Sequence, residues 1–108
     1  MLGLALDERL FVQVPTPVLA QVHRGDRDHA RTDRALSEID EFLETTVKIA
    51  RDAGELLALA GLSDAIDAIV AAEALGGTPA AIITSDPDDL TDLVEAGGGH
   101  RRVSVQGV

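Results

Sequence analysis

Apolar residues along this chain alternate between short continuous runs and sets with helical spacing. Continuous runs such as Ala80-Ala81-Ile82-Ile83-Thr84 are typical of buried strands, and apolar residues three or four apart indicate helices. The pattern predicts strands over residues 10–14, 41–45, 80–84 and 102–106, and helices over residues 18–24, 26–40, 47–60, 64–75 and 87–96. Strands that alternate with helices predict a single α/β domain with a parallel sheet flanked by helices, whose strands place their carboxyl ends along one edge.

Residue types that favour helix ends support these boundaries. Thr46 and Ser63 are suitable N-caps, and Gly61 is suited to close the helix that Thr46 begins. Asp86 is followed by Pro87, which favours the first helical position. The sequence therefore predicts where three of the helices begin.

Composition narrows the class of protein. The chain has 108 residues, enough for one domain (1–108), and 45% of them are apolar, so it can form a core. It contains no Cys, which excludes disulfides and thiolate metal sites. The apolar start, residues 1–6, is too short for a signal peptide, and no run is long enough to span a bilayer. We expect a soluble cytoplasmic protein without a membrane partner.

The formal net charge of −10 argues against general electrostatic binding of nucleic acid. The excess acid then belongs to a solvated surface, a metal site or a face for a basic partner. A helically spaced set of arginines is better explained as a solvated face, paired with the acids between them, than as a track for phosphates. This set comprises Arg24, Arg27, Arg31 and Arg34.

Asp67 is the most informative single residue. It lies within Ala65-Ile66-Asp67-Ala68-Ile69-Val70-Ala71-Ala72, a helix that is apolar on every face and therefore expected to be buried. A carboxylate there must be paired, bound to metal or placed at the helix mouth, because burial of a bare charge is costly. Asp64 lies three residues earlier on the same side, and preference for the positive helix end is the alternative explanation for both acids.

Asp86 directly follows the predicted strand 80–84, and Asp88 and Asp89 come just after it. Capping of the next helix is a sufficient explanation for Asp86 alone. Two helix starts loaded with Asp in one short α/β chain instead favour a site for a hard cation such as Mg²⁺, which prefers carboxylate oxygens. We therefore expect Asp64, Asp67 and Asp86 to converge at one edge of the sheet. Two such ions can promote phosphodiester hydrolysis.

Three blocks of this sequence together resemble a PIN domain. The blocks are Val14-Pro15-Thr16-Pro17-Val18-Leu19-Ala20-Gln21-Val22, Ser63-Asp64-Ala65-Ile66-Asp67-Ala68-Ile69-Val70-Ala71-Ala72-Glu73-Ala74 and Ile83-Thr84-Ser85-Asp86-Pro87-Asp88-Asp89-Leu90. The chain looks most similar to VapC-type ribonuclease toxins of toxin–antitoxin pairs. The resemblance covers nearly the whole chain and preserves the order of the blocks.

The resemblance implies a sheet of about five parallel strands and a cluster of acids that holds Mg²⁺ or Mn²⁺ and cleaves RNA. Asp67 and Asp86 match the two acids of the conserved blocks, while Asp64 and Asp89 are auxiliary candidates. Gln21 stands where the family often has Glu; its amide oxygen can be a weak metal ligand, but it brings neither charge nor a base.

A second departure from the family concerns the start of the chain. The family opens with an Asp-bearing strand at the centre of the sheet, and no such strand precedes the first block; Asp7 is in the wrong context. We therefore expect an N-terminally truncated domain with a gap in the sheet, a tendency to self-associate, and an impaired nuclease site.

Two alternatives belong to other classes. The first is a catalytically inactive PIN fold that binds a cognate antitoxin or a second copy of itself, and the acidic balance suits a basic antitoxin segment at least as well as RNA. The second is an unrelated Asp-rich α/β module of the receiver type, for which only Asp86 lies near the position of an acceptor.

Overall fold

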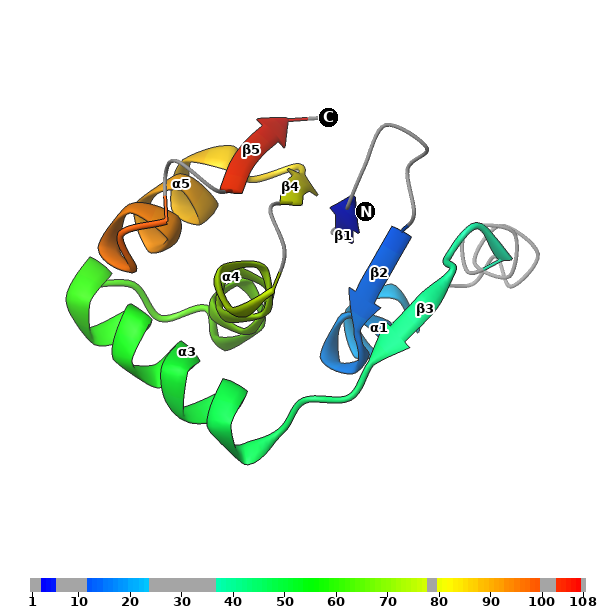
Figure 1. Ribbon diagram of the computed structural model, residues 1–108, viewed down its shortest axis with the longest axis horizontal. Coiled ribbons are helices and arrows are strands. Elements are labelled where there is room, and N and C mark those ends of the chain that lie inside the picture. The colour runs from blue at the N-terminus through cyan, green and yellow to red at the C-terminus, as the bar shows by residue number, and fades with distance from the viewer. Residues whose placement is uncertain (1–2, 6–11, 24–36, 78–79, 100–102, 108) are drawn as a thin grey trace.

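A computed structural model describes residues 3–5, 12–23, 37–77, 80–99 and 103–107 of the protein. Five strands form one sheet in the order β3-β2-β1-β4-β5, and helices α3, α4 and α5 gather on one side of it (Figure 1). The α/β class predicted from the sequence is confirmed. Within these residues, no helix has the length and apolar character needed to cross a bilayer.

The sheet consists of two parallel pairs joined by a central antiparallel strand. Strand β2 (Val12–Pro15) is parallel to β3 (Glu41–Leu43), and β4 (Ala80–Thr84) is parallel to β5 (Val103–Gly107). Between the pairs lies β1 (Gly3–Ala5), which is antiparallel to both β2 and β4. The predictions of an all-parallel sheet and of a gap at its centre are therefore wrong.

The short distance in sequence between β1 and β2 explains the direction of β1. Only residues 6–11 separate these strands. Parallel neighbours need a crossover of about a dozen residues or more, whereas antiparallel neighbours can be joined by a tight connection. The backbone groups of β2 and β4 that face the centre need partners, and the apolar start of the chain provides them in the direction that this connection allows.

The described helices begin close to the predicted positions. Helix α1 spans Thr16–His23, α3 spans Val47–Ala60, α4 spans Ala65–Gly76 and α5 spans Pro87–Ala96. Thr46 caps α3 by accepting a hydrogen bond from the Ile49 N–H at 3.1 Å, and Gly61 ends it with a left-handed φ of 69°. The predicted cap Ser63 is wrong, because Asp64 caps α4 instead.

The predicted helix over residues 26–40 falls mostly outside the described residues, as does the arginine set between Arg24 and Arg34. The predicted end of this helix at residue 40 is wrong, because Asp40 is hydrogen-bonded to β2 instead. The Asp40 N–H donates to the Val12 carbonyl at 2.9 Å, and Asp40 Oδ2 accepts from the Val12 N–H at 2.7 Å. These two bonds position the chain for its parallel pairing with β2. Asp7 also lies outside the described part.

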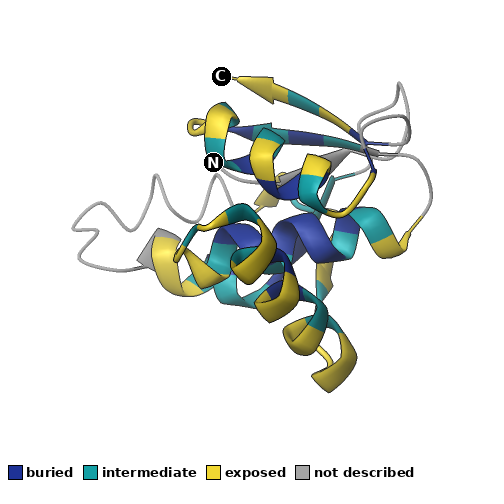
Figure 2. Ribbon diagram, turned by 90° about the vertical axis from the view of Figure 1, so that its left-hand side faces the viewer, coloured by how far each residue is buried: buried dark blue, intermediate teal, exposed yellow. Residues whose placement is uncertain are grey.

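Helix α4 forms the centre of the core (Figure 2). It contacts β1, β2 and β4 of the sheet as well as α3 and α5. Ala68, Val70 and Ala71 have no exposed surface, and neither do Ile82 of β4 and Leu90 of α5. A helix buried on most of its surface requires the nearly continuous apolar sequence seen in this segment. Any charged side chain on its buried face is therefore exceptional.

We expect Gly99→Ala to lower the free energy of unfolding by about 1–3 kcal/mol, the usual cost of overpacking a core. Gly99 is buried, and a Cβ atom built there would overlap Leu75 Cδ2 of α4 and lie 3.3 Å from its Cγ. Gly54→Ala is the matched control. Gly54 is exposed within α3, and apart from the adjacent backbone of its own helix and its chain neighbours, no atom lies within 4 Å of the added methyl group. That change should instead stabilise the protein by up to about 1 kcal/mol through helix propensity. Urea unfolding followed by circular dichroism measures both, and equal stability of Gly99→Ala and wild type would contradict the packing argument.

Candidate metal centre

Asp67 lies in the first turn of α4 on its buried face, with 7% of its surface exposed. The same face carries Val70, Ala71 and Ala74, which are all buried. The apolar neighbours on either side of Asp67 in the sequence place it there, since each is part of the core or borders it. The structure thus confirms that a carboxylate is buried at this position.

Asp64 is the N-cap of α4. Its Oδ1 accepts hydrogen bonds from the backbone N–H groups of Ile66 and Asp67, each at 3.0 Å. These bonds satisfy two of the helix donors that have no partner within the helix. Asp64 thereby fixes the first turn of α4 and the backbone that carries Asp67.

Asp86 follows the carboxyl end of β4 and precedes α5, yet its side chain makes no capping hydrogen bond. Asp86 thus occupies the predicted N-cap position of α5, but capping does not account for its carboxylate. Its backbone N–H donates instead to Thr84 Oγ1 at 3.0 Å, and Thr84 is 3% exposed at the end of β4. Thr84 positions Asp86 through this bond, a role that the sequence analysis did not assign to it. A hydroxyl residue at a strand end, two positions before an acid, was the available signal.

Asp67, Asp86 and Asp89 converge. One carboxylate oxygen from each lies within 4.8 Å of the others, with Asp67 buried, Asp89 half-buried and Asp86 exposed. Asp89 is in the first turn of α5, so the group joins the amino-terminal ends of two helices with the carboxyl end of a strand. The expected convergence of Asp67 and Asp86 is confirmed as geometry, and we call these three residues the acidic triad.

Burial and mutual repulsion destabilise negative charge in the acidic triad. Burial, followed by the charges of Asp64, Asp86 and Asp89, raises the pKa of Asp67 from 3.8 to about 6. The pKa of Asp89 is also raised, mainly by the charge of Asp86. The described Lys and Arg residues are Lys48 and Arg51, which both lie on α3, and the described His23 lies on α1. No described cation thus belongs to α4 or α5, the helices that carry the triad.

The donor set of the acidic triad fits a hard divalent cation. Mg²⁺ binds carboxylate oxygens at about 2.0–2.1 Å in octahedral geometry, so two adjacent ligand oxygens lie about 3 Å apart. The triad atoms lie within 4.8 Å of one another, so ligation of one Mg²⁺ by all three would require the side chains to draw closer together. Three carboxylates and water are suited to Mg²⁺ or Mn²⁺, while Cys-preferring metals are excluded by composition.

The acidic triad does not include the other candidate residues named from the sequence. Asp88 is exposed in the first turn of α5, and Gln21 is exposed on α1. Asp64 lies close enough to raise the pKa of Asp67, but its oxygens are not among the triad ligand atoms. Roles for Asp64 and Gln21 as metal ligands remain predictions.

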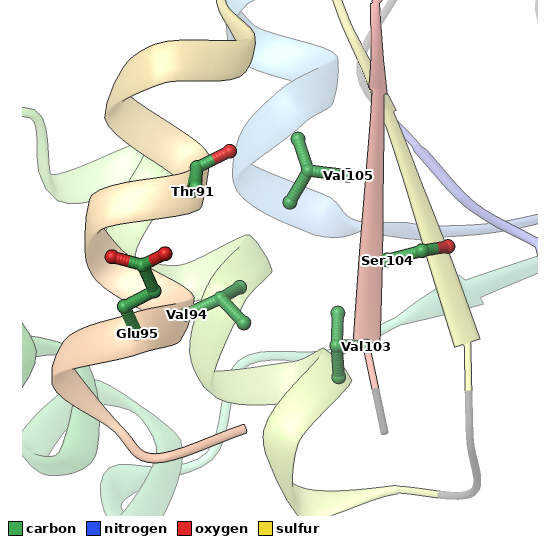
Figure 3. Close-up of a pocket in the computed structure, with 6 residues that line it drawn as sticks. All are labelled: Thr91, Val94, Glu95, Val103, Ser104 and Val105. Atoms are coloured by element: carbon green, nitrogen blue, oxygen red, sulfur yellow. The ribbon is translucent and has the colours of Figure 1, made fainter. Parts of the chain in front are cut away.

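Two hollows of the described surface lie away from the acidic triad. One, of about 240 Å³, lies between α5 and the edge strand β5 (Figure 3) and is lined by Thr91, Val94, Glu95, Val103, Ser104 and Val105. The other, of about 440 Å³, lies among α3, α4 and the end of α5. Neither includes a residue of the triad. The acids therefore do not line either of these hollows.

Comparison with protein families, with functionally characterised proteins and with solved structures finds no match to this chain.

Proposed function

We propose that this protein is a metal-dependent endoribonuclease of the PIN type, acting as the toxin of a toxin–antitoxin pair in the cytoplasm. One Mg²⁺ or Mn²⁺ is held by Asp67, Asp86 and Asp89, with Asp64 beside them. The observation that carries the proposal is the convergence of these three carboxylates within 4.8 Å at the carboxyl end of β4. Sites in open α/β sheets form at that end of the strands.

The residues of the acidic triad differ in exposure, and we assign them different roles on that basis. Asp67 is buried and fixed by α4, so it anchors a cation at a defined depth. Asp86 is exposed and makes no capping bond to α5, so its carboxylate faces the acidic triad and solvent, where it can hold a cation or accept a proton from water. A bound divalent ion supplies Lewis-acid stabilisation of charge on phosphate oxygens and makes the attacking water more acidic.

The negative charge of the protein opposes RNA binding unless a cation is present. With a net charge of −10 and an acidic triad at the site, phosphates are repelled in the absence of cations. A divalent cation at the triad offsets most of the negative charge of its three carboxylates. RNA binding is therefore expected to depend on the cation as much as cleavage does. With one such site instead of two, we expect cleavage to be slow.

A second candidate is a catalytically inactive module of the same fold that binds a basic antitoxin. The acid excess favours it, and so do exposed apolar side chains that suit a protein contact. Val47 and Leu59 of α3 are 70% and 71% exposed, and Phe42 of the edge strand β3 is 41% exposed. This candidate predicts no metal-dependent cleavage.

Titration with Mn²⁺, followed by electron paramagnetic resonance, tests the metal centre directly. We expect one bound Mn²⁺ per chain, displaced by excess Mg²⁺, together with slow cleavage of a fluorescent single-stranded RNA and none of the DNA of the same sequence. Mn²⁺ binding without cleavage would favour the binding module. Absence of saturable Mn²⁺ binding would reject the proposed centre.

A further inference from the structure

The central strand β1 is held by few backbone pairs. It spans Gly3–Ala5, between β2 with four residues and β4 with five. Its register pairs it with β2 at Leu4↔Gln13 and Ala5↔Val12, and with β4 at positions 81–83. Val14 and Pro15 of β2 extend beyond these pairs, as do both ends of β4. The two parallel pairs of the sheet are thus joined through a strand of only three residues.

The position of β1 needs an occupant at all times. Strands β2 and β4 run in the same direction, and each has its other edge paired with β3 or β5. Their inward-facing N–H and C=O groups would have no partner if β1 left, and buried backbone groups without partners are costly. Departure of β1 is therefore favourable only when another strand of the same kind replaces it.

We infer that the position between β2 and β4 accepts residues Gly3–Ala5 of a second copy of this protein, so that two copies form a strand-exchanged dimer. The structure itself shows which segment fits, because Gly3–Ala5 occupies this position with a defined register. Reciprocal exchange reproduces every one of these pairs without a new interface, which makes it a low-cost route to a dimer.

The order of elements favours this exchange. Strand β1 comes first among the strands, and residues 6–11 are its connection to all the strands that follow. Among the described strands, β1 can therefore change partners without moving another one out of the sheet. The inference goes beyond the proposed function and does not depend on it, since it uses only the sheet.

Disulfide trapping between two differently tagged chains tests the exchange, and the natural absence of Cys makes the background clean. One chain carries Ala5→Cys and the other carries Ala81→Cys, positions that face each other in the antiparallel register. Facing residues have Cα atoms about 4.5–5.5 Å apart, within disulfide range. We expect a mixed disulfide whose yield rises with protein concentration. The pair Gly3→Cys and Ile83→Cys repeats the test if the first pair folds poorly.

A matched control places the second cysteine one strand further out. Ser104 of β5 is exposed and lies opposite Ala81 in the β4–β5 register, so Ser104→Cys is at the same level of the sheet but not beside β1. The Ala5–Ala81 mixture should give a several-fold higher yield of mixed disulfide than the Ala5–Ser104 mixture. Equal yields in the two mixtures would overturn the inference. So would disulfides that form only within a chain carrying both Ala5→Cys and Ala81→Cys.

Discussion

Asp67→Asn is expected to lower metal-dependent RNA cleavage by roughly 100-fold or more, equivalent to about 2.7 kcal/mol of transition-state stabilisation. The amide keeps the size of the side chain but removes the charge from the most buried member of the acidic triad. Without that anchor, Asp86 and Asp89 are left to hold the cation from α5 and the loop before it. Initial rates with a fluorescent RNA, across a range of Mn²⁺ concentrations, measure the loss.

Asp88→Asn is the matched control for this variant. It makes the same chemical change in the first turn of α5, but Asp88 is exposed and is not part of the acidic triad. We expect less than a threefold change in its rate, under about 0.7 kcal/mol on the same scale. Cleavage that survives Asp67→Asn, or that falls equally in both variants, would refute the assignment of the metal centre.

The metal-free protein is expected to lose stability as the pH rises from about 4 to about 6. The pKa of Asp67 is raised from 3.8 to about 6, first by burial and then by the neighbouring acids. The folded state therefore holds this proton more tightly than the unfolded state. The stabilising contribution is complete below the unfolded pKa and is lost as the pH passes through the folded pKa. A change of one in pKa corresponds to about 1.4 kcal/mol, so the loss is at most about 3 kcal/mol.

Comparison of Asp67→Asn with wild type isolates this contribution from that of the other acids. Above about pH 6.5 the metal-free variant should be more stable than wild type, and the difference should shrink towards pH 4. Urea unfolding at pH 4, 5, 6 and 7.5 with a chelator present gives the four values. Saturating Mn²⁺ at pH 7.5 should stabilise wild type and leave the variant unchanged. A difference independent of pH would mean that the charge of Asp67 is not destabilised in the fold.

The sequence predicted those parts of the candidate site whose structure depends only on residues within one short segment. The buried position of Asp67 follows from the apolar residues around it, and the start of α5 follows from Asp86 and Pro87. The sequence could not distinguish the N-cap carboxylate that bonds to its helix from the one that does not. Asp64 accepts two hydrogen bonds from the first turn of α4, whereas Asp86 makes none to α5 and lies within 4.8 Å of Asp67 and Asp89. That difference depends on how α4 and α5 meet.

By itself, the sequence determined the α/β class, most of the described helices and strands, and the apolar segment that becomes the buried helix α4. Hydrophobic periodicity and helix-end residues act over a few positions, so they can be read from one segment at a time. Only the tertiary structure decided that residues 3–5 form the central strand, that this strand is antiparallel, and that Asp89 joins Asp67 and Asp86. Each of these outcomes depends on contacts between backbone groups or carboxylates that are far apart in the sequence. A local sequence pattern does not show which distant groups will meet.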